Sequence, residues 1–207
     1  MIEVKNLYQS FGNKQVLDDV NMVIEKNEIT ALVGRNGAGK STLINSLLGL
    51  LPIKKGKINI KGKISYLPEK FMLYPALTGM ENMQFFAEAI DKKADAERIE
   101  ELLRSVRLWD DRDMQIKGYS KGMLQRLGLA ITLYQNSEIL ILDEPTSGID
   151  PIGRKEILEV LRSLTDKTIL LSSHHLDEIK QICTHVAFLE NNKLEKYTVE
   201  QFLQMNG

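Results

Sequence analysis

The chain has 207 residues, 43% of them hydrophobic and only five of them proline, so one compact domain is expected and disorder is not. Basic and acidic residues number 27 and 28, which indicates neither a nucleic-acid groove nor a polybasic membrane anchor. The sequence has no apolar run near the roughly 18 residues that span a bilayer and no signal-peptide pattern at its start, and its single cysteine, Cys183, is expected to be inert packing.

Residues 1 to about 68 are predicted to form short strands, interrupted by one loop and one helix. Polar and apolar residues alternate in Ile2-Glu3-Val4 and again in Lys57–Ile60, as in strands with one buried face. Ile29–Val33 is apolar enough for a buried strand, and the apolar residues downstream of it recur at helical spacing. These are Leu43, Ile44, Leu47 and Leu48.

The segment between this strand and this helix, Gly34–Ser41, fits the phosphate-binding pattern G-x-x-x-x-G-K-[ST] at every fixed position. Its glycines allow successive backbone N–H groups to wrap phosphates at the positive end of the helix. Lys40 would reach the terminal phosphates, and the Ser41 hydroxyl would ligate Mg²⁺. The predicted nucleotide-binding residues here are Gly34, Asn36, Gly37, Ala38, Gly39, Lys40, Ser41 and Thr42. A glycine-rich turn that binds nothing is the alternative.

From about residue 70 to 135 the pattern becomes helical. Apolar residues recur at helical spacing in three groups: Met83, Phe86 and Ala87; Ile99, Leu102, Leu103 and Val106; Leu124, Leu127 and Ile131. Strands then return at Ile139–Leu142 and Thr168–Leu171, on either side of a predicted helix that contains Ile157 and Leu161. Both strands are runs without alternation, which favours a mostly parallel sheet covered by helices on both faces.

The first predicted strand of this sheet leads into the phosphate loop at Gly34, and polar residues follow the other two strands. These are Asp143 and Glu144, then Ser173 and His174. Ligands of parallel sheets bind beyond the carboxyl ends of the strands. We therefore expect a phosphate loop, two carboxylates and an imidazole at one edge of the sheet.

The two carboxylates are expected to have different tasks, because neighbouring side chains in a strand point in opposite directions. Asp143 suits Mg²⁺, directly or through water. Glu144 then points toward the terminal phosphate, where it can accept a proton from the attacking water or orient it. The alternative is a pair of solvated carboxylates in a turn before Pro145.

With these motifs in this order, the chain resembles the ATP-binding-cassette (ABC) family, the ATP-hydrolysing subunits of membrane transporters, over essentially all 207 residues. The tract Y-S-K-G-M-L-Q is similar to the family's signature, L-S-G-G-Q. It keeps Ser120 and Gly122 and departs at the other three positions. In the family this segment caps the nucleotide of a partner subunit, and a helix that begins here can hold a γ-phosphate. A plain helix N-cap by Ser120 is the alternative.

Two further motifs match the family after the carboxylates. Ser147–Asp150 looks like the D-loop, which communicates between the two sites of a dimer; Asp150 before Pro151 is equally typical of a helix start. His174 matches the switch histidine, which contacts the γ-phosphate, and His175 is interpreted as a surface or packing residue.

Two weaker correspondences complete the set. Phe11 lies where the family places an aromatic ring against adenine, with Tyr8 as the competitor and a core role open for either. Glu69 occupies the position of the Q-loop glutamine, which senses Mg²⁺ and links the core to the helical insert. The glutamate keeps an oxygen for the metal but adds a negative charge, so we expect a catalytic sensor that depends more on metal and pH; a solvent-facing Glu69 is the alternative.

The resemblance implies an α/β fold within one ABC ATPase domain, residues 1–207. Residues 1–68 and 136–207 would form the P-loop NTPase core, with a mostly parallel sheet and an N-terminal antiparallel β part. Residues from about 69 to 135 would form an inserted helical subdomain. Glu69 and the altered signature look like the bacterial branch that exports drugs and antimicrobial peptides, including bacitracin- and lantibiotic-immunity systems.

The resemblance also implies that one chain is incomplete, because its phosphate loop and its signature face different nucleotides. Two cassettes, identical or paralogous, would close on two ATP molecules with Mg²⁺ and drive a separate membrane permease. The permease would dock near residues 69–90, where Phe71–Tyr74 offers apolar contacts or, alternatively, core packing. The chain would lie in the cytoplasm on the inner face of the membrane, with no nucleic-acid partner.

Other classes fit less well. A P-loop kinase or GTPase would lack the signature and the switch histidine, and no guanine-reading N-K-x-D appears. Cassette proteins that act on ribosomes or DNA do not fit this length. A cassette with a regulatory or non-transport role, which binds ATP and scarcely hydrolyses it, is the remaining alternative.

Overall fold

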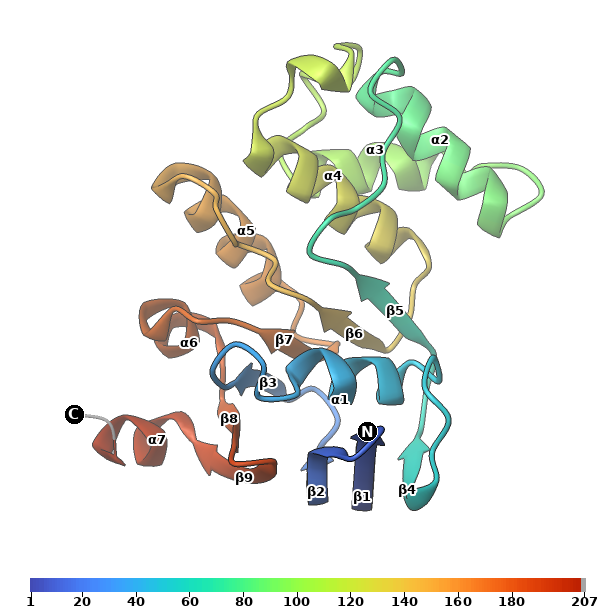
Figure 1. The fold of residues 1–207 in the computed structure, drawn as a ribbon. Coiled ribbons are helices and arrows are strands. Elements are labelled where there is room, and N and C mark those ends of the chain that lie inside the picture. Colours follow the sequence, from blue (N-terminus) through green and yellow to red (C-terminus); the bar gives the residue numbers. More distant parts are fainter. Residues whose placement is uncertain (206–207) are drawn as a thin grey trace. The chain divides into compact units, whose positions relative to one another are not determined.

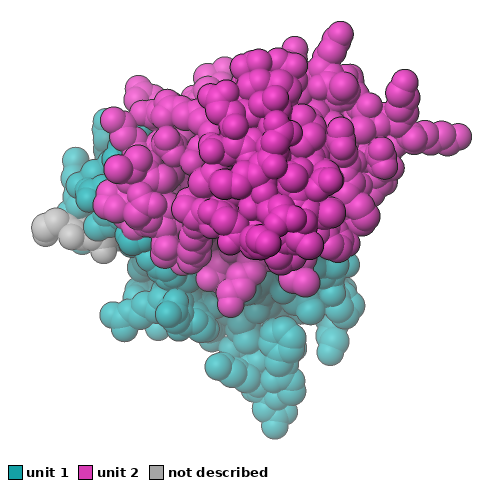
Figure 2. All heavy atoms as spheres, turned by 90° about the horizontal axis from the view of Figure 1, so that it is seen from above, with its two compact units in different colours: residues 1–64, 138–142, 166–207 teal, residues 65–137, 143–165 magenta. Residues whose placement is uncertain are grey.

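The structure is a computed structural model, described here for residues 1–205 (Figure 1). The chain divides into two compact units, drawn in teal and magenta in Figure 2. Unit 1 comprises residues 1–64, 138–142 and 166–207, and unit 2 comprises residues 65–137 and 143–165. Within residues 1–205, no helix combines the length and the hydropathy needed to cross a membrane.

Unit 1 begins with an antiparallel sheet in the strand order β2-β1-β4. Its strands are β1 (Ile2–Phe11), β2 (Lys14–Ile24) and β4 (Lys55–Ile60). Gly12 supplies the positive φ, +57°, of the tight turn between β1 and β2. Ile2 pairs with Ile24 on one side and with Ile60 on the other. The predicted N-terminal antiparallel β part is confirmed.

The second sheet of unit 1 is mostly parallel. Its strands β6, β7, β3, β8 and β9 lie side by side in that order, parallel except for the β8–β9 hairpin. They are β3 (Ile29–Val33), β6 (Ile139–Leu142), β7 (Thr168–Ser172), β8 (His185–Glu190) and β9 (Lys193–Thr198). Every residue of β6 and β7 is buried, as the absence of alternation predicts.

Three helices complete unit 1: α1 (Lys40–Leu47), α6 (Leu176–Ile182) and α7 (Val199–Met205). Cys183 follows α6 and packs against a buried cluster. The cluster comprises Ala31, Ile179, Val186 and Phe202. Burial raises the pKa of the Cys183 thiol to about 12, so the thiol stays protonated at neutral pH, in keeping with its predicted inert role.

A buried carboxylate ties β3 to the β8–β9 hairpin. Glu28 accepts hydrogen bonds from the Thr30 hydroxyl and the backbone N–H of Glu25, and it pairs with Lys196 Nζ at 2.6 Å. Burial raises the pKa of Glu28, but the hydrogen bonds from Lys196, Thr30 and Glu25 outweigh it and leave the pKa below its ordinary value. The ionised form of Glu28 therefore stabilises unit 1.

We expect Glu28→Gln to lower the free energy of unfolding by about 2 kcal/mol near neutral pH, since it removes the charge from a set of charge-assisted hydrogen bonds. Because the folded pKa lies below the unfolded value near 4.5, this contribution is present above about pH 4.5 and is lost as the pH falls through the folded pKa. Urea unfolding at several pH values measures it. The exposed Glu25→Gln is the control, and equal stabilities of the two variants would contradict the prediction.

Unit 2 begins within strand β5 (Ile64–Leu67) and is otherwise helical. Its elements are α2 (Gly79–Ile90), α3 (Ala96–Ser105), the short 3-10 helix η1 (Ile116–Gly118), α4 (Lys121–Tyr134) and α5 (Pro151–Ser163). Their apolar faces form its core, as the helical spacing predicts. Core residues include Met83, Ala87, Ile99, Leu103, Leu127, Ile131, Ile157 and Leu161.

Local chemistry explains where these helices begin. Thr78 and Glu81 form a reciprocal capping box at α2, and the Asp95 carboxylate caps α3. Helix α5, which the sequence assigned to the nucleotide core, groups by compactness with unit 2. The domain limits drawn from the sequence, with a helical subdomain over about 69–135, remain a prediction.

Candidate nucleotide site

The phosphate loop occupies the turn between β3 and α1 in unit 1. Gly37 and Gly39 have φ values of +80° and +112°, which side chains rarely adopt. A Cβ atom at Gly34 would lie 2.5 Å from the carbonyl oxygen of Leu189. The loop therefore requires glycine at these positions, and its backbone is bent so that N–H groups at the start of α1 remain available for a ligand.

The side chains of a lysine and a histidine meet at this loop. Lys40 Nζ donates to the Gly34 carbonyl at 2.7 Å and lies 3.5 Å from Nε2 of His174. Lys40 follows β3 and His174 follows β7, and these strands are parallel neighbours, with Ala31 beside Leu171. The sheet thus brings together a lysine and an imidazole that are 134 positions apart in the sequence.

The neighbouring histidine is placed differently. His175 is half-buried at the start of α6, and its backbone N–H donates to the Ser173 hydroxyl at 3.1 Å. The buried Ser173 hydroxyl in turn donates to Glu178 at 2.9 Å. His175 is therefore held as part of the α6 start, while His174 is exposed beside Lys40.

The carboxylate pair after β6 belongs to unit 2. The backbone N–H of Asp143 donates to the Leu67 carbonyl at 2.8 Å, and the Tyr66 hydroxyl lies 3.5 Å from Asp143 Oδ2. Burial, followed by the negative charge of Asp143, raises the pKa of Tyr66. Glu144 has a φ of +49°, an uncommon value for a residue with a side chain. Arg107 has a similar φ of +58°, so the value by itself does not assign a function, and the task of Glu144 stays a prediction.

The signature segment lies at the start of α4 in unit 2. Ser120 is the N-cap, and its hydroxyl accepts the backbone N–H of Met123 at 3.1 Å. Asp150 caps α5 in the same way, accepting from the N–H groups of Ile152 and Gly153 at 3.0 Å. The hydrogen bond from Gly153 is the main reason that the pKa of Asp150 is lowered. The capping roles considered for Ser120 and Asp150 are confirmed.

The starts of α4 and α5 are packed closely together. A Cβ atom at Gly122 would lie 3.4 Å from the Cα of Gly153 and 3.3 Å from a methyl group of Ile149. Glycine at both positions lets the two backbones approach. The signature and the D-loop-like segment are therefore neighbours within unit 2.

A buried arginine that the sequence pattern did not single out reinforces this contact. Arg126 Nη1 donates to the carbonyls of Val106 and Arg107 at 2.9 and 3.0 Å, and its Nη2 lies 3.1 Å from Glu156 of α5. Only 7% of Arg126 is exposed. Nothing in the local spacing distinguishes Arg126 from a surface arginine, because its partners come from other helices.

The two aromatic candidates for adenine differ in their surroundings. Phe11, at the end of β1, is 54% exposed. The Tyr8 ring is covered by the ammonium of Lys55, 3.7 Å from its centroid. Phe11 is therefore the more exposed of the two candidates, while Tyr8 is half-buried beneath a cation.

The residues suggested for Mg²⁺ have the right chemistry for it. Ser41 is exposed in the first turn of α1, and Asp143 and the exposed Glu69 belong to unit 2. Hydroxyl and carboxylate oxygens are hard ligands, which Mg²⁺ prefers together with phosphate oxygens and water. Residues 1–205 contain no group of three acidic, His or Cys side chains that could hold a metal by itself. Binding of Mg²⁺ by these residues stays a prediction.

Comparison with known proteins finds similarity to ATP-binding proteins of ABC transporters. A family model described as ABC transporter matches residues 17–147. The lantibiotic transport ATP-binding protein SrtF of Streptococcus pyogenes is 37% identical, over 94% of this chain and 89% of that protein. The bacitracin transport ATP-binding protein BcrA of Bacillus licheniformis is also 37% identical, over 94% and 68%. A solved ATP-binding subunit of an ABC transporter is 30% identical, with a TM-score of 0.84 over 100% of this chain and 93% of that one.

Proposed function

Because this chain belongs to the ABC transporter family and is one of its ATP-binding, ATP-hydrolysing cassettes, we propose that two such cassettes pair head to tail around two ATP molecules. The observation that carries the ATP-binding part of the proposal is the contact between Lys40 and His174 at the phosphate loop, 3.5 Å apart. The phosphate loop with Lys40 and His174 would form one half of each ATP site and can bind phosphates. The signature segment at Ser120 would supply the other half from the paired cassette.

Each residue has one task in this proposal. The backbone of Gly34–Thr42 binds the phosphates, Lys40 neutralises their terminal charge, and Phe11 stacks on adenine. Glu144 accepts the proton of the attacking water. His174 contacts the γ-phosphate from the neighbouring strand end.

The remaining residues act between the paired cassettes. Ser120 and Gly122, at the positive end of α4, bind the γ-phosphate held by the other cassette. Asp150 starts α5 beside them and relays between the two sites. Because Gly122 and Gly153 pack closely and Arg126 pairs with Glu156, the signature and the start of α5 would move as one part.

Mg²⁺ would be held by Ser41 and Asp143, with Glu69 linked to it. When bound, the ion neutralises phosphate charge and orients the terminal phosphate. The chain's own residues then position the water and remove its proton.

The chain needs a membrane-spanning partner for transport, and we infer that this permease holds it at the inner face of the cell membrane. The similarity to SrtF and BcrA favours an exporter of a drug or an antimicrobial peptide as the substrate class. The segment after Glu69 is the proposed place for the permease. Met72 and Tyr74 there are 84% and 46% exposed, which supports partner contact for these two, whereas Phe71 and Leu73 are half-buried.

A mixing experiment tests the shared sites directly. Lys40→Ala destroys the phosphate loop and Ser120→Arg blocks the signature, so each variant alone should lose ATP turnover. Mixed pairs contain one site built from an intact loop and an intact signature. We expect an equal mixture to recover up to about one quarter of the wild-type rate, because half of the pairs are mixed and half of their sites are intact. No recovery on mixing, or full activity of Ser120→Arg alone, would overturn the proposal.

Replacing Glu69 tests its link to the metal. We expect Glu69→Gln to keep ATP turnover within about tenfold of wild type and to make turnover less sensitive to Mg²⁺ concentration and to pH, since the neutral amide keeps an oxygen and removes one charge. Turnover measured across Mg²⁺ concentrations near neutral pH gives the answer. Unchanged curves would reject a role for the Glu69 charge.

A further inference from the structure

The signature segment of this chain carries a lysine, Lys121, where the signature of the family has glycine. Lys121 is exposed and is the first residue of α4, directly after the N-cap Ser120. The start of a helix bears a partial positive charge, so a cation there is electrostatically unfavourable. The first turn of α4 has no acidic residue that would offset this charge. Helix formation therefore does not account for a lysine at this position.

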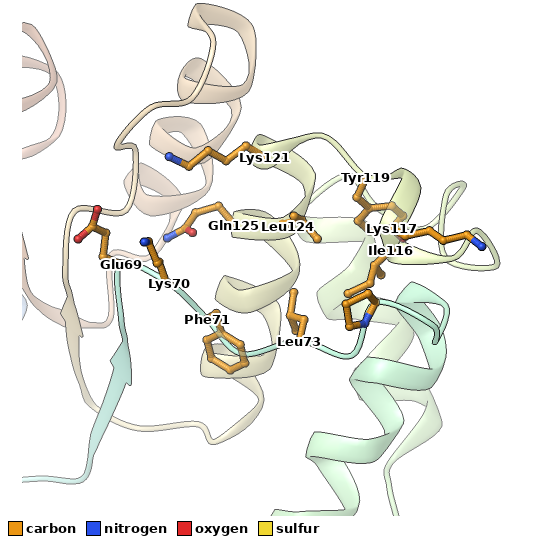
Figure 3. A pocket seen from close by; sticks show the side chains of 11 residues that line it. Glu69, Lys70, Phe71, Leu73, Ile116, Lys117, Tyr119, Lys121, Leu124 and Gln125 are labelled. Carbon is orange, nitrogen blue, oxygen red and sulfur yellow. The ribbon is translucent and has the colours of Figure 1, made fainter.

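The ammonium group of Lys121 has no counter-charge within unit 2. It takes part in no ion pair and no hydrogen bond with residues 1–205. Lys121 lines a pocket together with Glu69, the one carboxylate among the lining residues, but the two groups are not within ion-pair distance (Figure 3). Figure 3 shows the Lys121 side chain extending away from Ile116 and Tyr119, at the apolar end of the pocket. The charge is thus available to an anion of another molecule.

The Lys121 side chain lies against the D-loop-like segment, Ser147–Asp150. A Cβ atom at Gly148 would clash with Lys121 Nζ and would lie 3.6 Å from Lys121 Cε. Gly148 has a φ of +64°, a value that favours glycine, and the absence of a side chain leaves room for the ammonium group. The charge therefore lies between the signature and the segment that leads into α5.

Backbone donors lie beside this ammonium group. The first turn of a helix leaves N–H groups without acceptors inside the helix. The Ser120 hydroxyl accepts the N–H of Met123, whereas the N–H groups of Lys121 and Gly122 donate to no acceptor among residues 1–205. A terminal phosphate suits such a donor set, because its oxygens can accept several hydrogen bonds at once and its charge offsets that of the ammonium.

We propose that Lys121 binds the γ-phosphate of the ATP held by the paired cassette, beside Ser120 and Gly122. The inference rests on the proposed function, in which two cassettes pair head to tail. It adds a cation to the half of each site that the signature supplies. Because ADP has no γ-phosphate, Lys121 stabilises the pair with ATP and not the pair with ADP.

The mixture of Lys40→Ala and Ser120→Arg chains shows on which site Lys121 acts. The one intact site of a mixed pair combines the loop of the Ser120→Arg chain with the signature of the Lys40→Ala chain. We expect Lys121→Gln on the Lys40→Ala chain to lower the recovered turnover at least about tenfold, as for loss of a hydrogen bond between charged groups. The same substitution on the Ser120→Arg chain should change nothing, because the signature of that chain serves no intact site.

The two arrangements are matched controls for each other, since both contain the same substitution. Recovery with Lys121→Gln on the Ser120→Arg chain also shows that the substituted chain folds, because that chain supplies the intact loop. The reverse pattern would overturn the inference, since Lys121 would then act on the site of its own cassette, as an ion partner of Glu69 would. Equal recovery in the two arrangements would overturn it as well. Lys121→Arg on the Lys40→Ala chain keeps the charge and should keep most of the recovered turnover.

Pair formation gives a second readout, which needs no turnover. In the Glu144→Gln background, we expect Lys121→Gln to raise the ATP concentration at which half of the chains are paired by about tenfold at low salt. High salt should reduce this difference, because it screens charges. Lys117→Gln removes another exposed lysine of unit 2 and is the control, with no expected shift. A midpoint that ignores Lys121 would overturn the inference.

The results separate this inference from the proposed function. If Lys40→Ala and Ser120→Arg chains recover turnover on mixing and Lys121→Gln has no effect in either arrangement, only the role of Lys121 falls. If these chains recover nothing while Lys121 is intact, the head-to-tail pairing itself falls.

Discussion

Glu144→Gln is expected to lower ATP turnover by about 10²- to 10⁴-fold, the range typical of losing a general base. Glutamine keeps the size of the side chain and an oxygen, but it cannot accept the proton of the attacking water. Binding should persist, because the phosphate loop and its Lys40 belong to unit 1 and are unchanged. The variant should therefore accumulate as a pair with ATP trapped between its members, visible by size-exclusion chromatography with ATP and absent with ADP.

A matched control for Glu144→Gln is Glu138→Gln, at the other end of the same strand. Glu138 accepts the backbone N–H of Lys63 at 2.8 Å and lies at the amino end of β6, away from the carboxyl edge. We expect its turnover to stay near wild type. Turnover of Glu144→Gln that equals this control would remove Glu144 as the general base. Equal rates that all lie near background would favour the alternative role, a cassette that binds ATP and scarcely hydrolyses it.

Lys40→Ala is expected to weaken ATP binding by at least about 100-fold, since a charge-assisted contact with the terminal phosphates is lost in a partly buried site. The substitution also removes the hydrogen bond from Nζ to the Gly34 carbonyl, so the loop loses one of its internal supports. Titration with a fluorescent ATP analogue measures the affinity of the single cassette, without any need for pairing or turnover.

The control for Lys40→Ala is Lys54→Ala, which removes an exposed lysine between α1 and β4. Its affinity should match wild type. Circular dichroism should show both variants folded, because Lys40 is the first residue of α1 and alanine favours helix. If Lys40→Ala binds ATP with the same affinity as wild type, the phosphate loop does not bind the nucleotide as predicted.

The features of this chain that depend on a local physical requirement were predictable from its sequence. Helical spacing in groups such as Ile99 and Leu103 predicted α3, and the runs at Ile139–Leu142 and Thr168–Leu171 predicted two strands buried on both faces. Each rests on a periodicity that a short segment carries by itself. The same holds for Asp150 before Pro151, whose cap and proline start α5.

The roles of residues that depend on distant partners were not predictable in this way. Arg126 donates to the carbonyls of Val106 and Arg107 and pairs with Glu156. No local sequence pattern predicts these contacts. The covering of Tyr8 by Lys55 is another case, since the two residues meet only through pairing of β1 with β4. Helix α5 groups by compactness with unit 2, and its assignment to the nucleotide core stays a prediction.

The phosphate loop was determined by the sequence alone, because glycine at Gly34, Gly37 and Gly39 and a lysine at Lys40 meet backbone and charge requirements that operate within eight residues. The tertiary structure alone decided that His174 stands 3.5 Å from Lys40. That contact exists because β7 pairs with β3 in parallel, and strand pairing joins segments through hydrogen bonds and shared burial that no single segment specifies.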